Sequence, residues 1–142
     1  MKKIFAIAGL LALSITPTAS FGGHRPPNES EIRPGGNLRH TSLSGRNLSG
    51  RNLKGSNLSR ANLMRANLSG ADLSFANLSD ANLIGADLIR VDLSGAYLVG
   101  AWVKNANLSR ANLSGIRATN IKNCPRFLPD GWFCENKSLI QR

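Results

Sequence analysis

Few residues in this chain of 142 amino acids are suited to catalysis or metal binding. The sequence contains two cysteines, Cys124 and Cys134, and two histidines, His24 and His40. No His is near a Cys, and there is no phosphate-binding glycine loop, HExxH motif or nucleophile elbow. The many serines recur at repeat positions and do not suggest nucleophiles. We therefore predict no catalytic residues, no cofactor and no metal site, and a protein that is not an enzyme.

A five-residue repeat of the form Ala-Asn-Leu-Ser-Gly occurs sixteen times without a gap between Gly36 and Gly115. Leu is the central residue of fifteen copies, and Val103 is the centre of the remaining one. In an α-helix a five-residue step rotates about 140°, so these side chains would form no apolar stripe. In a flat strand an odd step sends successive Leu residues to opposite faces. The repeat therefore predicts a chain that bends once per copy and returns each Leu and Ala to a common interior.

Copies such as Ala61-Asn62-Leu63-Met64-Arg65 and Ala106-Asn107-Leu108-Ser109-Arg110 resemble pentapeptide repeats. The resemblance covers 80 of the 142 residues. It implies an all-β fold, a right-handed quadrilateral β-helix with four repeats per coil. Residues 36–115 would then form a solenoid of about four coils.

The first twenty residues have the layout of a secretory signal peptide. Lys2 and Lys3 precede an apolar run, and small and polar residues follow up to Ser20. The apolar run is shorter than the roughly 20 residues that span a membrane. We expect cleavage near Ser20, export, and no transmembrane segment afterwards. Eight Asn-x-Ser sequons would invite glycosylation in a eukaryotic secreted protein, which favours a bacterial periplasmic or extracellular location.

Two segments flank the repeats. Residues 21–35 are rich in Pro and Gly and are predicted to be a linker that stays loose or lies over the first coil. Residues 116–142 resemble the short tail of some exported family members, and their bulky apolar residues predict a lid over the last coil. In an exported protein the two cysteines of this tail favour a disulfide between Cys124 and Cys134. A metal site would need more ligands, and both histidines are far away in the sequence.

The formal charge of +10 falls to +8 when Lys2 and Lys3 are removed. Residues 36–70 contain no acid, residues 71–95 are mainly acidic, and the C-terminal end is basic again. The acidic cytoplasmic members of the family that mimic DNA and bind topoisomerases have the opposite charge, which disfavours that role and intracellular DNA as a partner. A basic rod is suited to anionic envelope components, although its arginines also serve solubility alone. The candidate anion-binding residues are Arg39, Arg46, Arg51, Arg60 and Arg65.

Residues twenty apart are expected to stack, which groups the few bulky outward residues. Met64 and Ile84 form one column beside Trp102, and Tyr97 and Val99 lie on the adjoining face. This group is a candidate contact patch for a partner, a second copy or the folded-back tail.

Asp72 and Asp92 stack by the same arithmetic, and close carboxylates can share a proton or a cation. Because Asp and Asn interchange at this repeat position, a structural turn role is favoured. The sequence thus predicts an exported, non-enzymatic solenoid that acts as a structural or protein-interaction scaffold, with an unknown protein or an anionic envelope component as its partner. A basic envelope-binding module is the alternative, and the oligomeric state stays open.

Overall fold

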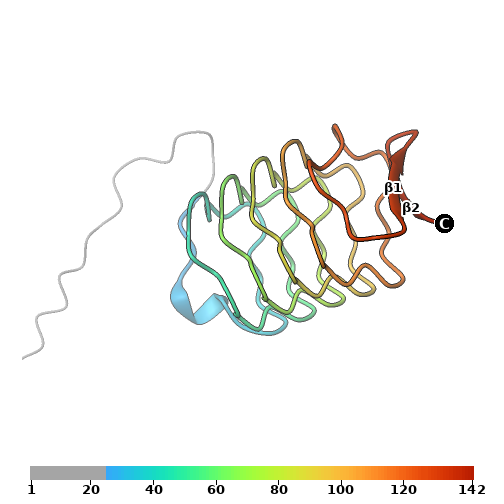
Figure 1. The fold of residues 1–142 in the computed structure, drawn as a ribbon. Coiled ribbons are helices and arrows are strands. Elements are labelled where there is room, and N and C mark those ends of the chain that lie inside the picture. Colours follow the sequence, from blue (N-terminus) through green and yellow to red (C-terminus); the bar gives the residue numbers. More distant parts are fainter. Residues whose placement is uncertain (1–24) are drawn as a thin grey trace, which may run out of the picture.

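The structure, a computed structural model, describes residues 25–142; the predicted signal peptide and His24 lie outside the described residues. The described chain winds into a stack of coils (Figure 1). Parallel bridges join residues twenty positions apart, from Asn37 with Asn57 to Asn107 with Phe127. Each coil therefore takes up four repeats, and we call the four bridged segments of a coil its sides.

The bridges form four columns along the stack. The first side comprises Asn37, Asn57, Asn77, Tyr97 and Arg117; the second comprises Ser42, Asn62, Asn82, Trp102 and Lys122; the third comprises Asn47, Asn67, Asp87, Asn107 and Phe127; and the fourth comprises Asn52, Asp72, Asp92 and Asn112.

The repeat satisfies all five of its backbone N–H groups, as residues 66–70 illustrate. The first N–H closes a turn on the carbonyl of Leu63 at 3.0 Å, and the second bonds to the preceding coil at 2.9 Å. The third and fifth bond to the following coil at 2.8 and 2.9 Å. The fourth donates to the side-chain Oδ1 of Asn67 at 3.0 Å. The Asn or Asp of the repeat is therefore the residue that closes each bend, because its side chain supplies the acceptor that the backbone lacks.

The core consists of the central residues of the repeats. The repeat Leu residues are at most 2% exposed, and Val103 and most of the alanines two positions before the centre are equally buried. The predicted common interior is confirmed. From Ala61 onward each copy places a small residue, mostly Ala, two positions before its central Leu or Val, so successive coils present matching side chains to one another.

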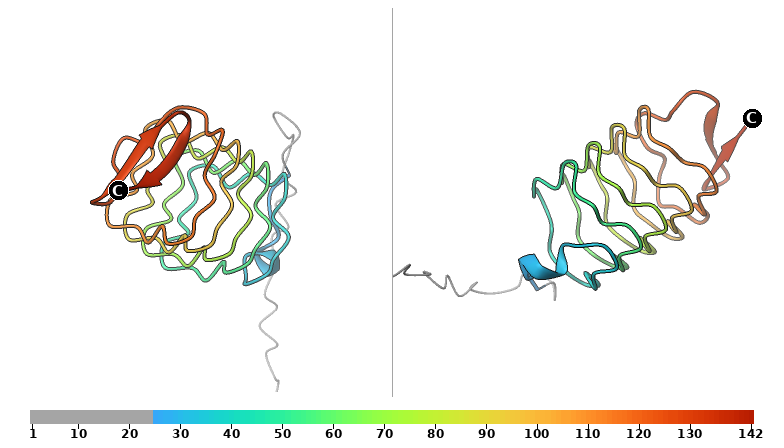
Figure 2. Two further views of the ribbon diagram at one scale, coloured as in Figure 1. Left: turned by 90° about the vertical axis from the view of Figure 1, so that its right-hand side faces the viewer. Right: turned by 90° about the horizontal axis from the view of Figure 1, so that it is seen from below.

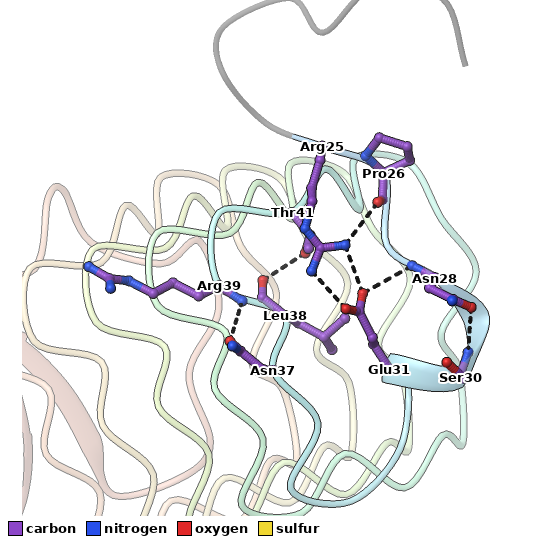
Figure 3. A network of polar contacts seen from close by, with 9 residues as sticks. All are labelled: Arg25, Pro26, Asn28, Ser30, Glu31, Asn37, Leu38, Arg39 and Thr41. Carbon is purple, nitrogen blue, oxygen red and sulfur yellow. Dashed lines mark hydrogen bonds and ion pairs between the residues drawn. The ribbon is translucent and has the colours of Figure 1, made fainter. Parts of the chain in front are cut away.

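Residues 25–35 pack against the first coil. The short 3-10 helix η2 (Glu29–Glu31) begins after Asn28, and Ile32 is buried in the core. The main chain of Arg25 forms a parallel bridge with Thr41, and its guanidinium makes two hydrogen bonds to Glu31, of 2.8 and 2.9 Å (Figure 3). Of the two arrangements considered for this segment, the structure thus has the one that covers the open end of the coil.

The C-terminal end is closed by a hairpin of β1 (Trp132–Glu135) and β2 (Ser138–Gln141), which lies across the last coil (Figures 1 and 2). Leu139 of β2 is buried in the core, and Trp132 and Cys134 pack against it. The coil ladder extends beyond Gly115 on three sides before this lid begins. Backbone bonding needs no particular side chain, so the ladder continues where the sequence repeat has already faded.

Candidate functional site

An open groove of about 490 Å³ lies along the second side of the coil stack. Asn62 and Asn82 line it, Trp102 and Ile84 contribute its bulkiest apolar side chains, and Arg60 is among its charged residues. The remaining lining residues are His40, Ala61 and Asp80. The volume is within the usual range of ligand sites, and one aromatic ring beside a few polar groups is a lining typical of such sites.

Trp102 occupies a repeat position where Asn is normally required. In the two preceding coils Asn62 and Asn82 each accept a hydrogen bond at 3.1 Å from the N–H two residues ahead. An indole has no hydrogen-bond acceptor, so Trp102 cannot accept the bond that closes the turn in the preceding coils. Its side chain remains 46% exposed. Tyr97 departs from the rule at the same repeat position of the first side and is also exposed, but only Trp102 lines the groove, which makes it the candidate contact residue there.

The charged groups of the groove partly neutralise each other. The Nε atom of Arg60 lies 3.7 Å from Oδ2 of Asp80, and both side chains are more than half exposed. At this exposure the pair adds little to stability, and both groups are accessible to a ligand.

The structure brings together only part of the predicted contact patch. Ile84 and Trp102 line the groove, and Met64 lies one coil before Ile84 in the same half-buried column. Tyr97 is on the first side, where Arg117 lies over its ring at 5.2 Å, and Val99 is at the corner that follows. Tyr97 and Val99 are exposed but are not among the lining residues of the groove.

The five candidate anion-binding arginines do not share a side. By their repeat positions Arg39 and Arg60 lie at the corner after the first side, and Arg65 lies at the next corner. Arg46 and Arg51 directly precede the third and fourth sides. Because the coil carries them in different directions, they cannot contact one small anionic group together.

The C-terminal lid holds the predicted disulfide between Cys124 and Cys134.

Arg46 takes the repeat position, two before the central Leu, that Ala occupies in most copies. In the structure it is half-buried, and its Nη1 pairs with Oε1 of Glu29 in the N-terminal segment at 2.5 Å.

Sequence reasoning missed Phe75, which is 60% exposed at the last position of its repeat. This position has a positive φ in the structure, 58° at Phe75 and 66° at Gly95 one coil later. The ring of Phe75 lies where a side chain on Gly95 would be, 2.7 Å from an ideal Cβ. The Nζ of Lys54 is 5.8 Å from the ring centre. The twenty-residue spacing between a Phe and a Gly was the signal that could have identified this contact.

Asp72 and Asp92 serve the turns, as the repeat position suggests. Asp72 accepts hydrogen bonds from the hydroxyl of Ser74 at 2.6 Å and from its N–H at 2.9 Å, and these bonds, led by the hydroxyl, lower the pKa of Asp72. Asp92 accepts from the N–H of Ser94 at 2.9 Å and from Asn112 at 3.1 Å. Within residues 25–142 no group of three His, Cys, Asp or Glu side chains is arranged to hold a metal ion.

A second hollow, of about 610 Å³, lies on the third side between Asp87, Ile89 and Arg90 and contains no aromatic residue. None of the helices in the part of the chain that the structure describes has the length and apolar character of a membrane span.

A family model described as pentapeptide repeats matches residues 42–74, 66–102 and 76–115. The pentapeptide repeat protein Rfr23 of the cyanobacterium Cyanothece 51142 is 36% identical over 63% of this chain, with a TM-score of 0.48, and the chain spans 65% of its length. A pentapeptide repeat protein from the Arabidopsis thaliana thylakoid lumen is 28% identical, with a TM-score of 0.53, over 74% of this chain and 79% of that protein.

QnrB1, a plasmid-mediated fluoroquinolone resistance protein, is 15% identical with a TM-score of 0.22 over 61% of this chain and 59% of its own, which supports no functional argument. No curated protein sequence matches the chain.

Proposed function

Since the chain belongs to the pentapeptide repeat family, whose members are generally non-enzymatic structural or interaction proteins, we propose that it is an exported scaffold that binds a protein partner. Members of the family form right-handed β-helical solenoids, and we assign the same hand and four-sided shape to this chain. The second side, with the groove around Trp102, is the binding surface.

The observation on which the proposal rests is the replacement of the turn-forming Asn by Trp102 at the groove. Along the second side the preceding coils keep Asn62 and Asn82, which close their own turns. Trp102 instead exposes a large aromatic ring next to Ile84, and the ion pair of Arg60 and Asp80 supplies polar groups. Tryptophan, tyrosine and arginine are enriched among the residues that dominate binding energy at protein interfaces, and of the two exposed aromatic residues at this repeat position only Trp102 lines the groove.

Three observations support export. Residues 1–20 have the composition of a signal peptide. The disulfide of the C-terminal lid is typical of oxidising compartments. The relative from the Arabidopsis thylakoid lumen is a protein of a compartment outside the cytoplasm.

The test is a pull-down from the envelope fraction of the producing cell with wild-type protein and two variants. Trp102→Asn restores the residue that the repeat normally has, so the coil is expected to fold as before while the groove loses its ring. Tyr97→Asn is the matched control, because it removes an exposed aromatic residue of the neighbouring side. We expect the same partner protein to be retained by wild type and Tyr97→Asn and at least tenfold less by Trp102→Asn, since an interface Trp contributes about 2 kcal/mol or more.

Each pull-down is run at low and high salt. A partner held by the aromatic groove should be retained at both salt concentrations, because apolar contacts are not screened. Equal retention by Trp102→Asn, or complete loss of the partner from wild type at high salt, would refute binding through the groove and would favour a basic envelope-binding module.

A further inference from the structure

The lid at the C-terminal end has an apolar pair on the face turned away from the core. Phe133 of β1 lies directly opposite Ile140 of β2, whereas the neighbouring pair, Cys134 and Leu139, faces the core. Side chains alternate between the two faces of a hairpin, so Phe133 and Ile140 point outward. Phe133 is 43% exposed, and no described part of the chain lies beyond the hairpin (Figures 1 and 2). This face forms the flat tip of the rod.

Exposed cations surround this tip on several sides. Arg117 extends the first side, Lys122 the second, and Arg126 directly precedes Phe127 of the third. Lys137 is in the hairpin turn, and all four cations are exposed. Residues 116–142 contain five basic and two acidic side chains.

One of the two acids of this segment is already paired. The carboxylate of Glu135 lies 2.6 Å from Nη2 of Arg142, whose guanidinium is 5.4 Å from the ring centre of Phe133. The tip therefore presents an apolar centre with four remaining cations against one remaining acid, Asp130.

We propose that this tip docks end-on onto an anionic lipid surface. A linear polymer lying along the rod would contact the cations of one side only, whereas a plane across the end meets all of them together. Each cation that reaches an anionic bilayer contributes a similar amount to the free energy of binding. These contributions add when several cations reach the surface together. An exposed Phe at the centre suits the boundary between head groups and acyl chains. Lys122 follows Trp102 in the column of the second side, but none of the tip residues lines the groove, so the proposal does not depend on the function proposed above.

Vesicle co-sedimentation of residues 25–142 tests the proposal, since this segment closes both ends of its own core. Vesicles of phosphatidylcholine with phosphatidylglycerol are compared with phosphatidylcholine alone at an ionic strength of about 0.1 M, where the Debye length is about 10 Å. The tip variant combines Arg117→Gln, Lys122→Gln and Arg126→Gln. We expect its partition onto the anionic vesicles to be weaker than that of wild type by roughly 100-fold, from about fivefold for each cation.

The matched control combines Arg33→Gln, Arg39→Gln and Arg51→Gln, three exposed arginines at the other end of the rod. It has the same net charge as the tip variant and is expected to bind within about threefold of wild type, because these charges lie beyond the Debye length from the surface. An equal loss in both variants would show non-specific attraction and overturn the proposal, as would equal binding of wild type to both kinds of vesicle.

Phe133→Ser provides a second variant that leaves every charge in place. It is expected to weaken binding to anionic vesicles roughly tenfold while its far-UV spectrum stays that of wild type. Unchanged binding of this variant would contradict the proposal that Phe133 contacts the lipid surface. Retention of wild type on immobilised heparin without binding to vesicles would assign the cations to an anionic polymer and would also contradict it.

Discussion

Replacing Gly50 by alanine isolates the backbone cost of the left-handed position that ends each repeat. Gly50 has a φ of 64°, and an ideal Cβ at this residue would meet nothing within 4 Å. No steric contact is therefore added, and the effect comes from conformation alone. The left-handed region costs a non-glycine residue about 1 to 2 kcal/mol. Alanine recovers about 0.4 to 1 kcal/mol by restricting the unfolded chain.

The net destabilisation expected for Gly50→Ala is about 1 kcal/mol, or a fall of about 3 to 5 °C in the melting temperature. Gly50→Asn should lose less than half as much, because Asn tolerates this region. The reciprocal change Arg90→Gly, two coils further along the same corner at a φ of 56°, should be stabilising. The assay is thermal unfolding followed by circular dichroism under oxidising conditions.

The order of the three variants is the critical result. If Gly50→Ala were neutral, or if Gly50→Asn were as costly as Gly50→Ala, the left-handed backbone would not explain why the last repeat position is Gly in so many copies. A loss in Arg90→Gly would show instead that the arginine side chain contributes contacts that outweigh the strain of its backbone.

Changing Cys124 and Cys134 to Ser together should destabilise the lid by about 2 to 3 kcal/mol. The measurement is the difference in unfolding free energy from urea titrations. An unchanged midpoint of the urea titration would mean that the disulfide does not restrain the unfolded chain. Arg25 and the N–H of Asn28 hold the pKa of Glu31 below its usual value of 4.5, in that order of importance. This contribution is present above about pH 4.5 and disappears as the pH falls through the lowered pKa, so the melting temperatures of wild type and Glu31→Gln should differ at pH 7 and converge towards pH 3. Gly36→Ala should destabilise the N-terminal segment by about 1 to 3 kcal/mol, because the new Cβ would lie only 1.9 Å from the carbonyl oxygen of Glu31. The readout is the protection of the Ile32 amide from hydrogen exchange. Unchanged protection would contradict this packing.

The repeated part of the fold could be predicted because every copy obeys the same local rule. A period of five excludes a helical stripe and a flat strand, and Leu at the centre then requires a coil with a common interior. The same regularity placed residues twenty apart in one column, so Ile84 could be placed in the column next to that of Trp102. The position of each side chain around the rod follows from counting alone.

The ends could not be predicted in the same way, because they depend on residues outside the repeat. Packing of residues 25–35 onto the first coil rests on Ile32 and on the hydrogen bonds between Arg25 and Glu31, which no periodicity indicates. The contact of Phe75 with Gly95 depends on a side-chain rotamer over the next coil. The five arginines were grouped by charge alone, although counting their repeat positions already places them in different directions around the rod.

Site-specific photocrosslinking in the intact producing cell tests most directly the claim that the second side is the binding surface. A photoreactive amino acid replaces Ile84 in the groove or, as the control, Ser109 on the third side. The proposed function predicts one discrete crosslinked protein from position 84 that is absent from position 109 and disappears when Trp102→Asn is added. Equal crosslinking from both positions, or a product at position 84 that persists with Trp102→Asn, would contradict it.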